Sequence, residues 1–180
     1  EVKAINKIIN DMLDYSRTSP PVLMEVDINE LLRGVKAASK FPENITVQLL
    51  LSEGIRRISI DKDEVKQVIG NLVRNAVVAM TTMNANKGGT LTICTGETFI
   101  VRDGVRTRAN SIEVSDTGCG IPPESLKKIF DPFFSTSPGG TGLGLAVTKK
   151  TIEERHKGTI EVKSKVGEGT SFILKIPGGN

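Results

Sequence analysis

Residues 63–83 read DEVKQVIGNLVRNAVVAMTTM, and this stretch has the hydrophobic periodicity of one long helix. The apolar residues of one face recur at helical spacing: Val65, Ile69, Leu72, Val73, Ala76 and Met80. Asp61 precedes the stretch and is the expected N-cap. A helix with one apolar face must bury that face on a second layer, which the neighbouring residues should supply.

The neighbouring stretches are mostly typical of strands. Residues 88–116 predict two strands joined by a hairpin turn at Asp103 and Gly104. The other predicted strands are residues 21–27, 44–52, 56–61, 158–164 and 169–177, with turns at Gly54 and Gly167, and the other predicted helices are residues 28–40, 123–130 and 145–156. Because strands outnumber helices and do not alternate strictly with them, we expect an α+β fold with helices on one sheet face.

The first residues form a separate pattern. Residues 1–17 carry one apolar stripe at helical spacing, and Pro20 and Pro21 then prevent the helix from continuing. We therefore expect a helix over 1–17, a linker over 18–21 and one domain over 22–180. The chain opens with Glu1 rather than Met, so we expect it to be a piece of a longer protein.

Composition excludes several classes of protein. Of the 180 residues, 38% are hydrophobic and 25% are charged, which is typical of a globular domain and not of a disordered chain. A net charge of +3 is too small to indicate a nucleic-acid or membrane surface. Cys94 and Cys119 are expected to be reduced thiols in a cytoplasmic protein, and no apolar run is long enough to cross a membrane.

The single histidine narrows the possible chemistry further. A histidine-rich metal site is excluded, and a Ser-His-Asp triad would depend on His156 alone. The surrounding EERHKG is typical of the last turn of a helix, so a helix-end role is the favoured interpretation of His156. No P-loop sequence is present.

Two asparagines on the long helix are the first candidate functional residues. Asn71 and Asn75 are four positions apart and share one face, beside the apolar stripe. Their amides could contribute oxygen to a hard cation or donate to a phosphate, or they could simply be polar residues at a helix interface. Glu64 lies on roughly the same side, and its favoured interpretation is a solvated carboxylate in the first turn of the helix.

The second candidate is an aspartate at the end of a strand. The sequence SIEVSDTGCGIP, residues 111–122, alternates as a strand up to Asp116 and then reaches Gly118 and Gly120. An ionised carboxylate accepts hydrogen bonds only, which suits an exocyclic amine such as that of adenine. The glycines would allow the backbone to approach a flat ring, although Asp-x-Gly is also a common turn.

The third candidate is a glycine-rich stretch, SPGGTGLGLAVTKK, that leads directly into a predicted helix. Its glycines, at 139, 140, 142 and 144, would offer flexible backbone N–H groups to a polyphosphate. The alternative is a surface loop with a glycine-assisted helix entry. Phe130, Phe133 and Phe134 lie just before it, and we expect them to attach a lid to the body or to contact a partner.

Taken together, QVIGNLVRNAVVAM, VSDTGCGIP, IFDPFFST and GGTGLGLAV resemble the N, G1, F and G2 boxes of bacterial sensor histidine kinases. These kinases belong to the wider Bergerat-fold ATPase group, and the resemblance covers nearly all 180 residues. It implies an α+β two-layer sandwich in which helices cover one face of a mixed β-sheet. The helix over 1–17 resembles the end of the second helix of the dimerisation and phosphoacceptor domain.

The resemblance also implies roles for individual residues. Asn75 would coordinate Mg²⁺ at the ATP phosphates, with Asn71 close by. Asp116 would receive the adenine amine with Thr170 as a companion hydroxyl, Gly118 and Gly120 would line the base, and Ile121 and Leu143 could enclose it. Residues from Phe133 to Thr141 would form a lid over ATP, and Gly140, Thr141, Gly142 and Gly144 would contact the phosphates.

The implied reaction is transfer of the γ-phosphoryl group of ATP to a histidine, followed by relay to an aspartate of a response-regulator receiver domain. The implied partners are that receiver domain and the protein's own dimerisation domain in a homodimer, with no nucleic acid and no direct membrane contact. His156 lies in the wrong box to be the acceptor, so the acceptor histidine is expected outside this chain.

Two departures leave alternatives open. Many relatives have a lysine where this chain has Ser137, and relatives often have Glu or Lys where it has Val78. A nucleotide-sensing module without transfer activity is therefore one alternative, and a Bergerat-fold serine kinase or plain ATPase is another. The helix over 1–17 argues against the second, because such proteins need no dimerisation stalk there.

Overall fold

The structure of this chain is a computed structural model that describes residues 9, 12–13, 15–81, 88–137 and 140–178. Its helices are α2 (Ile28–Ala38), α3 (Lys62–Thr81), α4 (Pro123–Leu126), α5 (Gly144–Lys150) and the π-helical turn η1 (Thr151–Arg155). Its strands are β1 (Met24–Val26), β2 (Ile45–Leu50), β3 (Ile58–Ile60), β4 (Gly89–Arg102), β5 (Val105–Asp116), β6 (Thr159–Lys165) and β7 (Gly169–Pro177).

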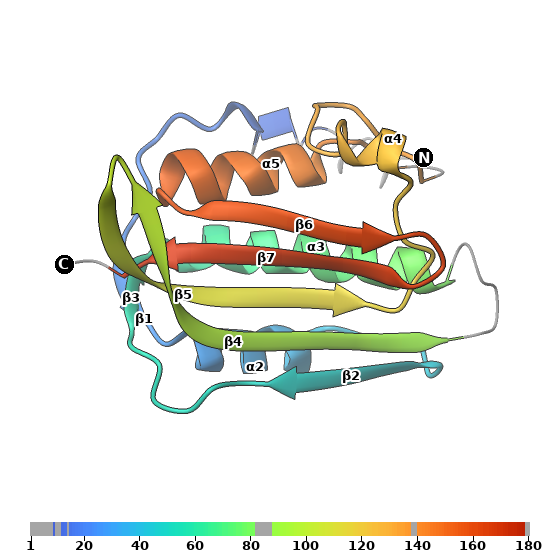
Figure 1. Ribbon diagram of the computed structural model, residues 1–180, viewed down its shortest axis with the longest axis horizontal. Helices are drawn as coiled ribbons and strands as arrows, with labels where there is room; N and C mark the ends of the chain where they lie inside the picture. Colours follow the sequence, from blue (N-terminus) through green and yellow to red (C-terminus); the bar gives the residue numbers. More distant parts are fainter. Residues whose placement is uncertain (1–8, 10–11, 14, 82–87, 138–139, 179–180) are drawn as a thin grey trace.

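Five of the strands form one mixed sheet in the order β2-β4-β5-β7-β6. β2 runs parallel to β4, and every other neighbouring pair is antiparallel. Figure 1 shows α2, α3 and α5 lying side by side behind this sheet, which confirms the predicted two-layer α+β fold. The hairpin between β4 and β5 turns at Asp103 and Gly104, as predicted, and both residues have positive φ angles.

The core lies between the two layers. Long helix α3 occupies the centre of the helical layer and buries its predicted apolar face. Side chains alternate along a strand, so every second residue of the sheet points towards α3. The buried hydrophobic residues on that side of the central strands include Leu91, Ile93, Ile112, Val114, Phe172, Leu174 and Ile176. Asp61 caps α3 as expected, because its Oδ1 accepts from the backbone N–H groups of Asp63 and Glu64, each at 3.2 Å.

One pairing could not be read from the sequence. The strands predicted over 44–52 and 56–61 exist and are joined through a turn at Gly54. They do not lie in the same sheet, because β2 joins the five-stranded sheet whereas β3 pairs with β1 in a separate two-stranded sheet.

Two predicted helices differ from the structure. The helix predicted over 123–130 ends at Leu126, after which Lys128 and Asp131 donate backbone hydrogen bonds to residues three positions earlier, as in tight turns. The helix predicted over 145–156 begins at Gly144 and widens into η1, where the His156 N–H donates to the carbonyl of Thr151, five positions earlier, at 3.1 Å.

Most of the helix predicted over residues 1–17 lies outside the described residues. Of those that are described, Ile9, Met12, Leu13, Tyr15 and Ser16 are helical and exposed, whereas Arg17 is exposed and lies beyond the helix. Within the described ranges, no helix combines the length and the apolar character needed to cross a membrane.

Candidate functional site

The fold brings the first and third candidate motifs together at the start of α5. The Asn71 side chain, on α3, is half-buried, and its Nδ2 donates to the carbonyl oxygen of Gly144 at 3.4 Å. Asn75, one turn further along α3, is exposed. The two asparagines therefore differ: Asn71 connects α3 to the glycine-rich segment, whereas the Asn75 amide faces solvent.

Asp116 lies at the end of β5 with its carboxylate held by backbone groups. Its Oδ1 accepts from the N–H of Gly118 at 2.8 Å, and the backbone N–H of Thr170 also donates to the carboxylate. Burial raises the pKa of Asp116 to about 6, although both hydrogen bonds act to lower it. Asp116 is thus a partly desolvated group that is mostly ionised at neutral pH and accepts hydrogen bonds.

The two glycines after Asp116 are required by packing. A Cβ on Gly118 would lie 2.7 Å from the Cβ of Ala79 and 2.8 Å from Asp116 Oδ1. Gly120 has a φ of +70°, and a Cβ there would lie 2.1 Å from the carbonyl oxygen of Lys165. The loop after Asp116 therefore lies directly against the C-terminal end of α3 and the turn after β6, contacts that the sequence did not reveal.

Three polar side chains lie in one row across the sheet at this end. Ser164 of β6 pairs with Thr170 of β7, and Thr170 pairs with Asp116 of β5. The hydroxyl oxygens of Ser164 and Thr170 are 2.9 Å apart, and the backbone N–H of Ile121 donates to Ser164 Oγ at 2.8 Å. Asp116, Ser164 and Thr170 line a shared shallow cavity of about 320 Å³.

Ser164 was missed by the sequence analysis. The available signal was its place in β6, where it follows Ile160 and Val162 on the inward face and puts a hydroxyl at an apolar position of the alternation.

The segment after α4 closes into a loop that needs a glycine at position 142. The N–H of Phe133 donates to the carbonyl of Gly142 at 3.0 Å, which closes the segment into a loop. Gly142 has a φ of +69°, and a Cβ there would lie 2.3 Å from the carbonyl carbon of Phe133. The predicted lid over 133–141 includes Gly139, which lies outside the described residues, whereas Gly140 and Thr141 are inside them.

The three phenylalanines before the glycines have different environments. Phe130 packs edge-on against Phe172 with the ring centroids 6.5 Å apart, and Phe134 packs on the core. Phe133 is 65% exposed. Two of the three rings therefore attach this segment to the body of the domain, and the third faces outward.

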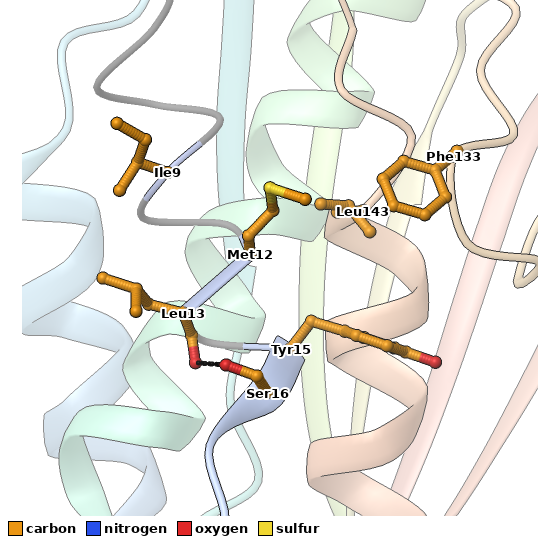
Figure 2. A pocket seen from close by; sticks show the side chains of 7 residues that line it. All are labelled: Ile9, Met12, Leu13, Tyr15, Ser16, Phe133 and Leu143. Carbon is orange, nitrogen blue, oxygen red and sulfur yellow. Dashed lines mark hydrogen bonds between the residues drawn. The ribbon is translucent and has the colours of Figure 1, made fainter.

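Leu143 faces the N-terminal helical residues. It is buried and lines a cavity of about 350 Å³ with Phe133 and with Ile9, Met12, Leu13, Tyr15 and Ser16. Figure 2 shows Met12 pointing towards Leu143, with the Phe133 ring beside it. Ile121, its expected companion, does not line this cavity.

Glu64 is not a solvated first-turn carboxylate, so that interpretation was wrong. It is 4% exposed, and Arg155 Nε lies 3.0 and 2.9 Å from its two carboxylate oxygens. The pair forms because η1 packs beside the start of α3, two segments that are far apart in the sequence.

His156 is at a helix end, as favoured, but it is buried. Its Nε2 accepts from the backbone N–H of Asp61 at 3.1 Å, so Nδ1 carries the proton and donates to the carbonyl of Thr151 at 3.0 Å. Both ring nitrogens therefore have backbone partners, and the Nε2 bond joins the end of η1 to the residue that caps α3. Neither nitrogen is available for chemistry.

The donor set near α3 suits a cation that is shared with a phosphorylated ligand. Across the residues that the structure describes, no three His, Cys, Asp or Glu side chains gather into a metal site. Mg²⁺ commonly takes only one or two protein oxygens and completes its shell with phosphate and water, so the exposed Asn75 amide fits this mode. Val78 is half-buried and Ser137 is exposed, and neither supplies a charge.

Known proteins resemble this chain in sequence. A family model described as "Histidine kinase-, DNA gyrase B-, and HSP90-like ATPase" matches residues 60–180. The sensor histidine kinase ZraS of Salmonella typhi is 33% identical over 180 residues, which are 98% of this chain and 36% of that protein. The histidine-protein kinase AtoS of Escherichia coli (strain K12) is 34% identical over 98% of this chain and 28% of its own length. The chain thus spans about a third of the length of these relatives.

Solved structures of histidine kinases also resemble this chain. The nucleotide-free catalytic domain of histidine kinase ThkA matches with a TM-score of 0.71 and 32% identity, over 87% of this chain and 95% of that one. ThkA in complex with the response regulator TrrA matches with a TM-score of 0.76 and 30% identity, over 99% of this chain and 48% of that one. Full-length ShkA in complex with AMPPNP matches with a TM-score of 0.78 and 25% identity, over 98% of this chain and 36% of that one. The chain belongs to the histidine kinase-, DNA gyrase B- and HSP90-like ATPase family, in which it is homologous to the catalytic domains of sensor histidine kinases.

Proposed function

We propose that this chain binds Mg-ATP and transfers its γ-phosphoryl group to a histidine of another segment, for relay to a response-regulator aspartate. The observation that carries the proposal is the setting of Asp116, a partly buried acceptor held by the backbone N–H groups of Gly118 and Thr170. A partly buried carboxylate of this kind is matched by a ligand that donates hydrogen bonds to it, and the 6-amino group of adenine is such a donor.

At the adenine end, Asp116 would accept from the 6-amino group, directly or through water. Thr170 lies beside it as its register partner and would supply a second polar contact. Gly118 leaves no side chain between the loop and α3, and Gly120 leaves none between the loop and the turn after β6, so the loop backbone and Ile121 would border the base. Selection of adenine would thus depend on a carboxylate whose position is already fixed, without nucleotide, by hydrogen bonds from Gly118 and Thr170.

At the phosphate end, the segment that contains Gly140, Thr141, Gly142 and Gly144 would contribute its backbone. Asn71 would hold this segment to α3 through the carbonyl of Gly144. Asn75 would hold Mg²⁺ through its amide oxygen, and the bound ion would neutralise phosphate charge during transfer. The work of the chain itself is to position the nucleotide and exclude water.

The acceptor would be a histidine outside this chain. His156 is the single histidine of the sequence, and both of its ring nitrogens are occupied by backbone partners. The exposed apolar side chains of Ile9, Met12 and Leu13 suit a helix that packs on another helix. We assign these residues to the dimerisation and phosphoacceptor domain of a homodimeric parent.

The response regulator is proposed as the second partner, by analogy with ThkA, which was crystallised with the response regulator TrrA. A domain with this activity would work in the cytoplasm, where ATP and the receiver domain are found. No nucleic acid and no direct membrane contact are part of the proposal, since the net charge is only +3.

Calorimetric titration with ATP and with a non-hydrolysable analogue, with and without Mg²⁺, tests the proposal. We expect binding that Mg²⁺ strengthens, little phosphate release by the chain alone, and transfer once a separately produced histidine-containing domain is added. Binding without transfer to any such domain would favour the nucleotide-sensing alternative. Rapid phosphate release by the chain alone would favour the plain ATPase.

A matched pair of variants sharpens the titration. Asp116→Asn replaces an acceptor with a mixed donor and acceptor and should weaken adenine nucleotides in particular. Asp103→Asn makes the same chemical change at an exposed hairpin turn and should leave binding unchanged. Equal loss of ATP and GTP binding in Asp116→Asn would count against adenine recognition by this residue.

A further inference from the structure

Ser164 Oγ lies within hydrogen-bond distance of three different groups. The backbone N–H of Ile121 donates to it at 2.8 Å, the carbonyl oxygen of Gly169 lies 3.0 Å away, and the hydroxyl oxygen of Thr170 lies 2.9 Å away.

Counting protons assigns a direction to each of these bonds. The N–H of Ile121 can only donate and the carbonyl of Gly169 can only accept, so the single proton of Ser164 goes to Gly169. The contact between the two hydroxyls then needs the proton of Thr170. The reverse assignment would leave two oxygens, Ser164 Oγ and Gly169 O, 3.0 Å apart with no proton between them.

Thr170 is therefore left as an acceptor towards any ligand, because its proton is already donated to Ser164. Asp116, its direct partner across the sheet, is also an acceptor. Two acceptors side by side match a 6-amino purine, whose amine has two N–H donors. They oppose a 6-oxo purine, which presents an acceptor at the same position.

We propose that Ser164 is a positioning residue that holds the Thr170 hydroxyl as an acceptor and thereby makes the site select 6-amino over 6-oxo purine triphosphates. This inference rests on the proposed function, in which adenine lies against Asp116. Ser164 acts through Thr170 and contacts no nucleotide itself.

The test compares ATP with inosine triphosphate, which has a 6-oxo group in place of the amine. Ser164→Ala frees the Thr170 hydroxyl to rotate and donate, so the ratio of the inosine triphosphate Kd to the ATP Kd should fall about three- to tenfold. In a Thr170→Val background, Ser164→Ala should change the ratio by less than about twofold, because the hydroxyl it orients is gone. Calorimetric titration gives both constants.

Controls separate orientation from loss of structure. Ser111→Ala removes another serine hydroxyl that donates to a sheet carbonyl, that of Gly96 at 3.2 Å, and should leave the ratio unchanged. If Ser164→Ala does not fold, the near-isosteric Ser164→Cys, whose sulfur is a weak acceptor for the Thr170 hydroxyl, carries the same test. Thermal melting in the absence of nucleotide monitors the fold of each variant.

The outcomes distinguish this inference from the proposed function. A wild-type chain that binds ATP and discriminates against inosine triphosphate, with a Ser164→Ala variant that weakens both nucleotides equally or neither, overturns the role of Ser164 alone. The same effect of Ser164→Ala with and without the Thr170 hydroxyl overturns it too. A wild-type chain that binds neither nucleotide overturns the proposed function, and the role of Ser164 with it.

Discussion

The guanidinium of Arg155 binds the carboxylate of Glu64, with Nε 3.0 and 2.9 Å from the two oxygens, although 91 positions separate the residues. The bond joins the end of η1 to the first turn of α3. Arg155 Nη2 also donates to the carbonyl of Ser19 at 2.8 Å, so the same side chain holds the segment before β1. One buried ion pair thus connects three segments that are remote in sequence.

Removing this carboxylate should destabilise the domain. Glu64→Ala leaves the largely buried guanidinium of Arg155 without its partner, and we expect the free energy of unfolding to fall by about 2–4 kcal/mol. Urea unfolding measures the change. The matched control is Glu161→Ala, which breaks the more exposed pair with Lys175 and should cost less than about 1 kcal/mol. An equal fall in the free energy of unfolding in the two variants would show that burial adds nothing to the contribution of the Glu64 pair.

Nucleotide affinity should depend on the ionisation of Asp116. Burial raises the pKa of this carboxyl to about 6, and only the ionised form accepts from both the backbone and an adenine amine. ATP affinity should therefore fall as the pH is lowered through about 6. Titrations at about pH 5 and about pH 7.5 measure the loss, which should be absent in Asp116→Asn. The same pH dependence in that variant would assign the effect to another group.

The stability of the domain should change in the opposite direction. Because the pKa of Asp116 is higher in the folded chain than the ordinary value of 3.8, the folded state holds more protons between about pH 4 and pH 6. The contribution of Asp116 to stability is therefore lost as the pH rises through about 6. Asp116→Asn should gain stability relative to wild type over this range, measured by urea unfolding at each pH. Asp103→Asn, at the exposed hairpin turn, should show no such trend.

Gly118, in the loop after β5, and Gly70, inside α3, should respond to alanine with opposite signs. Gly118→Ala places a Cβ 2.7 Å from the Cβ of Ala79, so we expect lower stability and weaker ATP binding. Gly70→Ala, within α3, meets no atom within 4 Å and should raise stability by up to about 1 kcal/mol. Melting and titration of both variants check the pair. A Gly118→Ala variant that melts and binds as wild type would contradict the close contact with α3.

The Mg²⁺ dependence of ATP binding should be sensitive to Asn75. Asn75→Asp replaces the exposed amide with a negative charge next to the proposed phosphate site, and we expect weaker Mg-ATP binding or transfer while the fold is kept. Asn44→Asp makes the same change at an exposed turn residue and serves as the control. Titrations of both variants with ATP, with and without Mg²⁺, measure the change in Mg²⁺ dependence. Unchanged Mg²⁺ dependence in Asn75→Asp would remove Asn75 from the metal site.

Much of the fold was predictable because its signals are local. The apolar stripe of α3, its cap at Asp61 and the hairpin turn at Asp103 and Gly104 depend on neighbours a few positions away, and the structure confirms them. The order of the boxes around Asn71, Asp116 and the glycine-rich segment was also readable, and the family assignment is confirmed. The roles of the individual site residues stay predictions.

The sequence by itself determined most of the helices and strands, the two-layer fold and the family, since periodicity, capping and turn chemistry act over short distances along the chain. Only the tertiary structure decided that Glu64 is buried against Arg155, that β2 and β3 join different sheets, and that Ser164, Thr170 and Asp116 form one row. Those outcomes depend on which segments pack together. The charge of a glutamate or the hydroxyl of a serine has no defined partner until that packing brings one to it.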